Sequence, residues 1–226
     1  MDEAIKLLDH GLVRLVDSMG GDLSIVRAAR VSYDAAARAG TDEGSDARLI
    51  DYLWRNRHTT PFEAVILTFE VKAPIFVFRQ WHRHRTWSYN ELSARYRPLP
   101  AEFYVPEVEQ IGFQSASSKQ ARDIDGEAPP LRAFEVELVR EHCNRQFVLY
   151  QQLLDSGWPK ELARSVLPVS TYSHMFATTN LLNLLKFLTL RVDPHAQHEI
   201  RVYAEAMRDL ARTIAPVAVG AWEKHL

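Results

Sequence analysis

The sequence that decides the fold runs Val65-Ile66-Leu67-Thr68-Phe69-Glu70-Val71-Lys72, and every second residue from Val65 to Val71 is apolar. Successive side chains of a strand point to opposite faces, so this pattern predicts a strand with one buried face. Ala73-Pro74 follows, and proline suits the first turn of a helix. We therefore expect a strand followed by a short helix that turns Ile75, Phe76, Val77 and Phe78 inward.

A polar segment comes directly after this helix and runs Arg83-His84-Arg85-Thr86-Trp87-Ser88-Tyr89-Asn90-Glu91-Leu92-Ser93-Ala94-Arg95-Tyr96. We expect it to lie outside the core. From residue 79 to 97 it has five arginines against Glu91 alone, in a chain whose formal net charge is -2. Guanidinium groups match phosphates and carboxylates in shape and charge, so the segment predicts a small anionic ligand. A solvated basic loop or a set of structural ion pairs is the alternative.

The amino-terminal part shows shorter elements. Residues 2–19 indicate a helix or a strand that ends at Gly20-Gly21, and Asp22 is expected to cap a helix through Arg30. Residues 36–44 are small and polar, as in a loop, and Ser45-Asp46 is expected to open a helix through Trp54. His58-Thr59-Thr60-Pro61-Phe62 is typical of a turn, because proline disfavours helical geometry in the residue before it.

The carboxy-terminal part predicts longer helices. Residues 97–128 indicate an irregular loop whose part from 114 to 126 is expected to be mobile and to form a lid. Pro129-Pro130 starts the longest helix, which ends near Ser156. We expect its apolar residues to be buried, namely Leu131, Phe134, Leu138, Phe147, Leu153 and Leu154.

A short helix over 159–167 and a strand over 169–178 are expected next. Asn180 then caps a helix ending near Arg191, and Asp193-Pro194 opens a last helix to about Ile214. The pattern as a whole predicts the α+β class. We expect one domain over 1–226, mostly helical around a small β-sheet, with the long helices after residue 128.

Composition narrows the class of protein. A chain of 226 residues is large enough to fold without disulfides, and Cys143, the single cysteine, lies at a core position of a helix. We therefore expect a reducing, cytoplasmic location. No apolar run is long enough to span a bilayer, so we expect no membrane association. The slightly acidic balance argues against general nucleic-acid binding.

The sequence lacks the motifs of a cysteine nucleophile, of a glycine-rich dinucleotide-binding loop and of a metal site. Cys143 has helical neighbours and is no obvious nucleophile, and Gly20-Gly21 is the only glycine pair, so a dinucleotide-binding glycine loop is missing. His82-x-His84 and His195-x-x-His198-Glu199 place imidazoles close together but match no recognised ligand set. We predict no metal.

The polar segment resembles the long, irregularly spaced signature of a known protein family. Arg83-His84-Arg85, seven residues and then Ser93, with Arg95-Tyr96 after it, resembles the signature of the flavin-dependent thymidylate synthases. The resemblance covers about residues 50–205 and also includes His58 to Glu63, Lys72 to Val77, Arg79 to Trp81, Ala163 to Pro168, Asn180 and Leu190 to Gln197.

The resemblance implies a reaction and a cofactor. It implies conversion of dUMP to dTMP with 5,10-methylenetetrahydrofolate as one-carbon donor, FAD as hydride carrier and NADPH as reductant, with tetrahydrofolate as product. In such chemistry the cofactor carries the hydride while the protein binds, orients and polarises. The resemblance also implies a homotetramer whose active sites are shared between subunits.

Site residues follow from the same resemblance. It assigns Arg191 to stabilising negative charge on the pyrimidine. For dUMP it implies Gln80, Arg83, Glu91, Leu92, Ser93, Ala94, Arg95, Arg164 and Arg191. For FAD it implies His58, Thr60, Arg83, His84, Arg85, Asn90, Glu91, Asn180, Leu182 and Lys186. Ala94 stands where the family commonly has glycine, and Lys186 where it frequently has asparagine.

Two interpretations from other classes stay open. An RNA-binding module would use the arginines with Trp81, Trp87, Tyr89 and Tyr96 as stacking platforms. A nonenzymatic nucleotide sensor would keep the dUMP pocket without oxidising NADPH.

Overall fold

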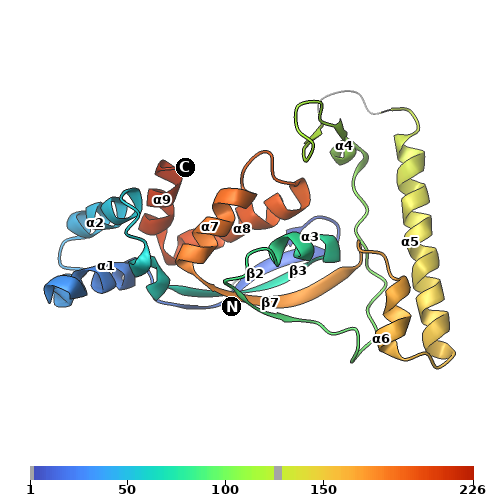
Figure 1. Cartoon of the computed structure of the whole chain (residues 1–226), viewed down its shortest axis with the longest axis horizontal. Coiled ribbons are helices and arrows are strands. Elements are labelled where there is room, and N and C mark those ends of the chain that lie inside the picture. Colours follow the sequence, from blue (N-terminus) through green and yellow to red (C-terminus); the bar gives the residue numbers. More distant parts are fainter. Residues whose placement is uncertain (1–2, 125–128) are drawn as a thin grey trace.

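The protein is built around an antiparallel sheet (Figure 1), and the computed structural model describes residues 3–124 and 129–226. The strands are β1 (Ile5–Leu7), β2 (Gly11–Met19), β3 (Ile66–Pro74), β4 (Ser88–Glu91) and β7 (Tyr172–Asn180). Their order across the sheet is β1-β2-β3-β7-β4. The central pair, β3 and β7, aligns Leu67 with Thr179 and Val71 with Met175.

The alternation in β3 places one face of the sheet in the core. Leu67, Phe69 and Val71 are all fully buried, which confirms the predicted strand and its inward face. Helices α3 (Ile75–Trp81), α7 (Leu181–Arg191) and α8 (His198–Ile214) lie on one side of the sheet (Figure 1). Val77 and Phe78 turn inward as predicted, whereas Ile75 and Phe76 are only partly buried.

The two ends of the molecule carry different helices (Figure 1). At one end lie α1 (Asp22–Arg30), α2 (Glu43–Arg55) and α9 (Pro216–Lys224), with short 3-10 turns η1 (Val31–Tyr33), η2 (Ala36–Arg38) and η3 (Thr60–Ala64). At the other end stand α5 (Arg132–Asp155), α6 (Lys160–Ala163) and the turn η4 (Arg164–Val166). The α+β class, with the long helices after residue 128, is confirmed.

The segment predicted as an irregular loop is mostly irregular. It contains a short helix, α4 (Val108–Ile111), and a small hairpin of β5 (Phe113–Gln114) and β6 (Arg122–Asp123). Gln114 steadies this hairpin, because its Nε2 donates to the carbonyls of Ser118 and Ala121. The predicted mobile part extends to 126, and residues 125–128 lie outside the described ones, so the lid stays a prediction.

The predicted burial along α5 is wrong at its amino-terminal half. Phe147 is buried, but Leu131, Phe134 and Leu138 are 67%, 61% and 48% exposed. The helix packs against a second apolar cluster, which consists of Phe103, Val105, Cys143, Phe147, Tyr150 and Ala163. Its buried α5 members lie on the later turns, whereas Val136 in the amino-terminal half is partly buried against it. Cys143 is thus a core residue, as predicted, while Leu153 and Leu154 are partly buried.

The expectation that the polar segment lies outside the core is wrong at two residues, Trp87 and Ala94, and Ala94 is 6% exposed. Trp87 is only 7% exposed, and its ring packs 5.2 Å from that of Phe187. The reason is that β4 joins the sheet edge beside β7 and turns this side chain under α7.

Two predicted helix caps are also wrong. The residue before α1 is Gly21, and the Asp22 carboxylate instead accepts the backbone N–H groups of Val217 and Ala218 at the start of α9. Helix α8 begins at His198, five residues after Asp193, whose carboxylate accepts from the His195 N–H. In both cases an aspartate adjacent to a predicted helix start is bonded elsewhere.

Across the described residues, no helix combines the length and apolarity that crossing a bilayer requires.

Candidate active site

Arg191, the last residue of α7, points back to the loop after α3. Its Nε donates to His84 Nε2 (3.2 Å), and a terminal nitrogen donates to the Gln80 carbonyl (3.4 Å). The side chain is half-buried, and this burial lowers the pKa of its guanidinium. Among the described residues no carboxylate lies within 4.0 Å of it. Arg191 is therefore a fixed cation held by neutral acceptors.

His84 is held neutral by its burial and by the same contact. Burial first, and then the charge of Arg191, lower the pKa of its imidazole to about 4. Since Nε2 accepts a hydrogen bond from Arg191, the proton of the neutral ring sits on Nδ1. The ring packs edge-on against Phe187, with centroids 4.9 Å apart. His84 thus offers a ligand an N–H donor without a positive charge.

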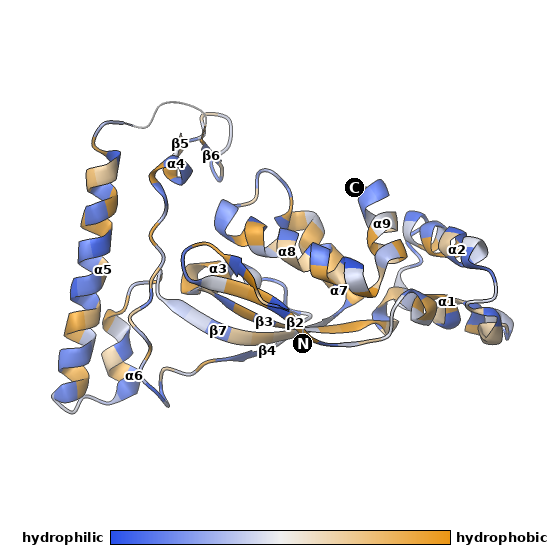
Figure 2. Cartoon of the chain, turned by 180° about the vertical axis from the view of Figure 1, so that it is seen from behind, coloured by the Kyte–Doolittle hydropathy of each residue, from blue (hydrophilic) through white to orange (hydrophobic). Residues whose placement is uncertain are grey.

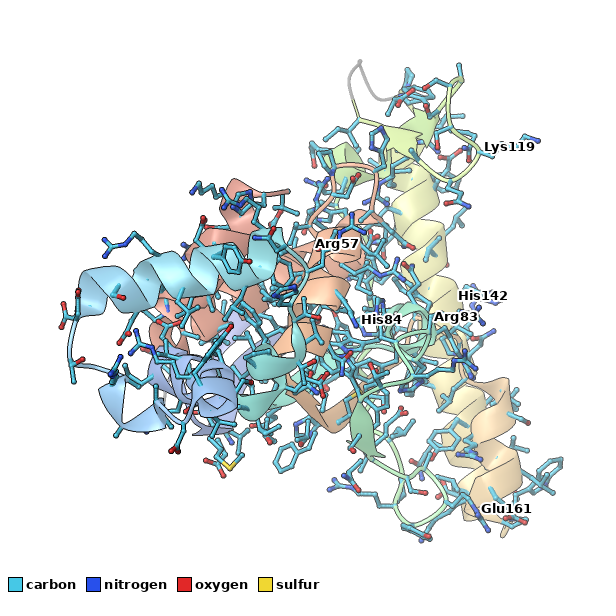
Figure 3. The ribbon with its side chains drawn as sticks, turned by 60° about the vertical axis from the view of Figure 1, so that its left-hand side comes forward. Arg57, Arg83, His84, Lys119, His142 and Glu161 are labelled. Carbon is cyan, nitrogen blue, oxygen red and sulfur yellow. The ribbon has the colours of Figure 1, made fainter. Side chains whose placement is uncertain are left out.

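The loop between α3 and β4 presents two further arginines. Tyr89 fixes the loop from below, because its hydroxyl donates to the carbonyls of His84 (2.8 Å) and Trp81 (3.2 Å). Figure 3 shows Arg83 and His84 close together on this loop. Arg83 and Arg85 are exposed, and within the described chain neither has a carboxylate partner within 4.0 Å. The alternative of structural ion pairs therefore does not hold for these two side chains.

A separate pair of cavities, of about 320 and 440 Å³, opens beside α3 and η4. Both are lined by Arg79, Glu91, Leu92 and Arg164, and we call them the Arg164 cavities. Ser93 lines one of them and Ala94 the other. Glu91 is oriented by Ser173, whose hydroxyl donates to it (2.6 Å). The structure therefore gathers five predicted nucleotide residues here, namely Glu91, Leu92, Ser93, Ala94 and Arg164.

Arg95 lies just outside these cavities. It forms an exposed ion pair of 3.4 Å with Glu161 on α6, the helix residue labelled in Figure 3. Exposed pairs of this kind contribute only about 0–1 kcal/mol. The guanidinium can therefore leave Glu161 for an anionic ligand at little cost.

Another cavity lined by predicted site residues, about 560 Å³, lies between α1, α2 and η3. His58 and Thr60 line it, as do Ser32 and Tyr33, and we call it the His58 cavity. Sequence reasoning missed Ser32 and Tyr33. Tyr33 is 87% exposed, but this exposure is seen only in the structure, and no motif in the sequence pointed to this place.

The remaining predicted cofactor residues lie around the start of α7. Asn180 caps the helix, because its Oδ1 accepts from the Asn183 N–H (2.9 Å), as predicted. Its side-chain NH2 stays available as a donor. Lys186 is exposed on α7 and Asn90 is exposed on β4, whereas Leu182 is 4% exposed and packs in the main core. Its side chain is therefore taken up by packing.

Sequence reasoning considered Glu199 only beside His195 and His198 as a metal ligand and missed that it is a buried carboxylate, 1% exposed. It lies on the apolar face of α8 with Tyr203, Met207 and Leu210, four, eight and eleven residues later. An acidic residue at helical spacing within an apolar stripe was the available signal. Among the described residues no group of three or more His, Cys, Asp or Glu side chains is placed to hold a metal.

Sequence comparison finds one family model, described as "Thymidylate synthase complementing protein", that matches residues 14–217. A flavin-dependent thymidylate synthase of Treponema denticola is 47% identical over 225 residues, covering 100% of this chain and 84% of the relative. Another, from a strain of Thermus thermophilus, is 46% identical and covers 98% and 79%.

Solved structures are similar over the same length. A UMP/dUMP methylase, PolB from Streptomyces cacaoi, bound with 5-Br dUMP superposes with a TM-score of 0.87, at 42% identity, over 97% of each chain. The same methylase with 5-Br UMP gives a TM-score of 0.82, at 41% identity, over 96% of this chain and 95% of the other.

Proposed function

Because this chain belongs to the family of flavin-dependent thymidylate synthases, we propose that it binds FAD and methylates dUMP to dTMP. The observation that carries the proposal is Arg191, a half-buried cation bonded to His84 and to the Gln80 carbonyl. A fixed cation without a counter-charge is already arranged to stabilise negative charge that develops on a pyrimidine ring. We therefore assign Arg191 as the catalytic residue.

The donor set fits the diphosphate of FAD. Arg83 and Arg85 are exposed, and no carboxylate among the described residues neutralises them. Neutral His84 adds its Nδ1–H, and the Asn180 amide adds a donor from the helix start. His58 and Thr60 would bind a further part of the cofactor in the His58 cavity. FAD, when bound and reduced, supplies the hydride.

We also propose that Asn90, Lys186, Glu91 and Leu182 contact FAD. Exposed Asn90 and Lys186 are free to reach the cofactor through their side chains, and Glu91 would contact both ligands. Leu182 would contribute through its backbone, because its side chain packs in the core.

For dUMP we propose the Arg164 cavities together with the Arg191 side chain. Arg164 and Arg95 would bind the phosphate, with Ser93 as a hydroxyl donor and with Leu92 and Ala94 beside it. Glu91 is held by Ser173 and would accept from the nucleotide. Gln80 and Arg83 would complete this set from the end of α3 and the loop after it.

We propose NADPH as the reductant and 5,10-methylenetetrahydrofolate as the one-carbon donor. The methylene carbon and the hydride together form the new methyl group, so the folate leaves as tetrahydrofolate. We place the reaction in the cytoplasm, where the single cysteine, Cys143, stays reduced, and assign it to one domain over 1–226.

We also propose a homotetramer with shared active sites. The chain exposes 13222 Å², against about 10,500 Å² expected for a compact monomer of its mass. Figure 2 shows hydrophobic residues along α5, and Leu131, Phe134, Leu138, Val139, Val148 and Leu149 are exposed there. The His58 cavity and the Arg164 cavities have no lining residue in common, which supports completion of each site by neighbouring subunits.

The visible absorption spectrum of the purified protein tests this function. After loading with FAD we expect a flavin spectrum that bleaches with NADPH under anaerobic conditions. Colour is expected to return when dUMP and methylenetetrahydrofolate are added together, with dTMP as product. Protein that stays colourless with FAD would contradict the proposal, and salt-sensitive RNA affinity would then favour the nucleic-acid interpretation. Binding of dUMP without NADPH oxidation would favour a nucleotide sensor.

A second candidate function is methylation of UMP. The observation that favours it is the similarity over nearly the full chain to a methylase of UMP and dUMP. The two nucleotides differ only in the 2′-hydroxyl, so initial rates with each, measured on one preparation, decide between the candidates. We expect dUMP to be the better substrate, and a higher kcat/KM with UMP would reverse the assignment.

A further inference from the structure

Glu199 is a buried carboxylate with three side-chain donors. Its Oε1 accepts from Arg122 (2.9 Å) and from the Tyr104 hydroxyl (3.0 Å), and its Oε2 accepts from Gln197 Nε2 (2.8 Å). Burial by itself raises the pKa of this carboxyl, but the charge of Arg122 and the hydrogen bonds hold the pKa below its usual value. Glu199 is therefore ionised at neutral pH and can only accept hydrogen bonds.

This restriction passes along a chain of amides. Gln197 must turn its NH2 group to Glu199, so its carbonyl oxygen Oε1 faces the other way and accepts from Gln80 Nε2. Gln80 must in turn use its NH2 group to donate to Gln197, so the Oε1 of Gln80 takes no part in this hydrogen bond. The orientation of an amide follows from its partners, and here one charged partner sets the direction for both amides.

The chain of amides ends at the proposed substrate site. Gln80 belongs to the proposed dUMP residues, and its backbone carbonyl accepts from Arg191. Arg122 lies on β6, so the hairpin of β5 and β6 is tied through Glu199 to the end of α3.

We propose that Glu199 is a positioning residue, which together with Arg122 and through Gln197 fixes the orientation of the Gln80 side-chain amide toward the nucleotide. This inference rests on the proposed function, because that function makes Gln80 a substrate contact. Glu199 itself does not touch the substrate.

Two single variants break the chain at different points. In Glu199→Gln the new amide can donate to Gln197, so the direction of the chain is no longer fixed. In Gln197→Met the exposed amide is lost, while Glu199 keeps Arg122 and Tyr104. For both we expect KM and Kd for dUMP to rise about tenfold, equivalent to about 1.4 kcal/mol. We expect kcat to change less than about threefold, and bound FAD to stay constant.

A charge swap separates orientation from simple stability. When Glu199→Gln is combined with Gln197→Glu, the carboxylate introduced at position 197 accepts from the amide introduced at position 199 and from the Gln80 amide. Gln80 thereby keeps its original direction. We expect KM and Kd for dUMP to return to within about threefold of the parent values. A tenfold change in Kd corresponds to about 1.4 kcal/mol of binding free energy. Glu205→Gln, the same change at a partly buried position of α8 with a weak 3.8 Å ion pair, is the matched control.

Calorimetric titration of dUMP into the FAD-loaded protein gives a result that does not depend on turnover. If the parent protein binds no dUMP, the proposed function fails. If the parent binds dUMP and Gln197→Met binds it equally well, only the positioning role is overturned, even where Glu199→Gln does not fold. Failure of the charge swap to restore binding, in a folded protein that retains flavin, also overturns it.

Discussion

His84 and Arg191 depend on each other at the level of single residues. Their 3.2 Å hydrogen bond uses the imidazole as an acceptor. Burial, and then the charge of the adjacent guanidinium, lower the pKa of the His84 imidazole to about 4. A protonated His84 would place two positive charges in contact in a half-buried place. The pair therefore consists of a neutral imidazole, His84, beside a permanent cation, Arg191.

Replacing Arg191 tests the catalytic assignment. For Arg191→Ala we expect dTMP formation to fall by about 100-fold to 1,000-fold, as for loss of a preorganised charge, while FAD stays bound. Product formation and flavin absorbance are measured on the same sample. Arg97→Ala removes an exposed guanidinium outside the proposed site and is the control. Loss of flavin together with activity would contradict the assigned role.

The low pKa of His84 predicts a pH dependence of stability. Its folded pKa of about 4 lies below the ordinary 6.5, so between these values the unfolded chain takes up a proton that the folded chain does not. Stability is full above pH 6.5 and declines as the pH falls toward 4. With solvent screening of the half-exposed ring, we expect a loss of about 1 kcal/mol by pH 5.

Urea unfolding at pH 7.5 and at pH 5 measures this loss, with His84→Gln as the comparison. Glutamine can still accept from Arg191 but does not titrate. We expect the parent to lose about 1 kcal/mol more unfolding free energy than the variant between the two pH values. Equal losses in both proteins would show that His84 is not the titrating group.

At the scale of elements, the start of α7 combines two tasks. Asn180 Oδ1 accepts from the Asn183 N–H and thereby caps a helix whose residues Leu181, Leu184 and Leu185 are fully buried. The proposed FAD contact uses the other half of the same amide. The two tasks therefore require different atoms.

Two substitutions at Asn180 separate these tasks. Asn180→Asp keeps the cap, and we expect its unfolding free energy to stay within about 0.5 kcal/mol of the parent, whereas Asn180→Ala loses about 1 kcal/mol. Both variants lose the NH2 donor, so both are expected to bind FAD more weakly. Urea unfolding and flavin titration measure the two effects. Parent-like FAD affinity in Asn180→Asp would leave Asn180 as a cap alone.

At the scale of the whole molecule, α5 has two apolar faces. One packs Cys143, Phe147 and Tyr150 into the second cluster, and the other leaves Phe134 and Leu138 exposed. A contiguous exposed apolar surface marks an interaction site. The large exposed surface of the chain is consistent with such a site.

Substitution on the exposed face tests the assembly. We expect Leu138→Ser to shift the protein toward smaller species at micromolar concentration, because each buried copy of the side chain contributes about 1.5–3 kcal/mol. Light scattering coupled to size-exclusion chromatography measures the mass. Arg145→Ser, on the same helix with a side chain 81% exposed, is the control. An unchanged mass with Leu138→Ser would remove this face from the proposed interface.

The sequence by itself determined the local features and the family. Alternation fixed the inward face of β3, Asn180 capped α7 where the pattern placed it, and the motif around Arg83 and Ser93 identified the relatives. These features can be read from neighbouring residues, because the side chains of a strand alternate between its two faces and a helix is capped by the residue just before it.

Only the tertiary structure decided which partners meet across the chain. Asp22 caps α9 from 195 positions away, Glu199 meets Arg122 and Tyr104, and Phe134 and Leu138 on α5 stay exposed. A side chain's partner is set by the packing of distant elements, and no local pattern encodes that. For the same reason the sequence named the candidate site residues, but their distribution over separate cavities required the fold.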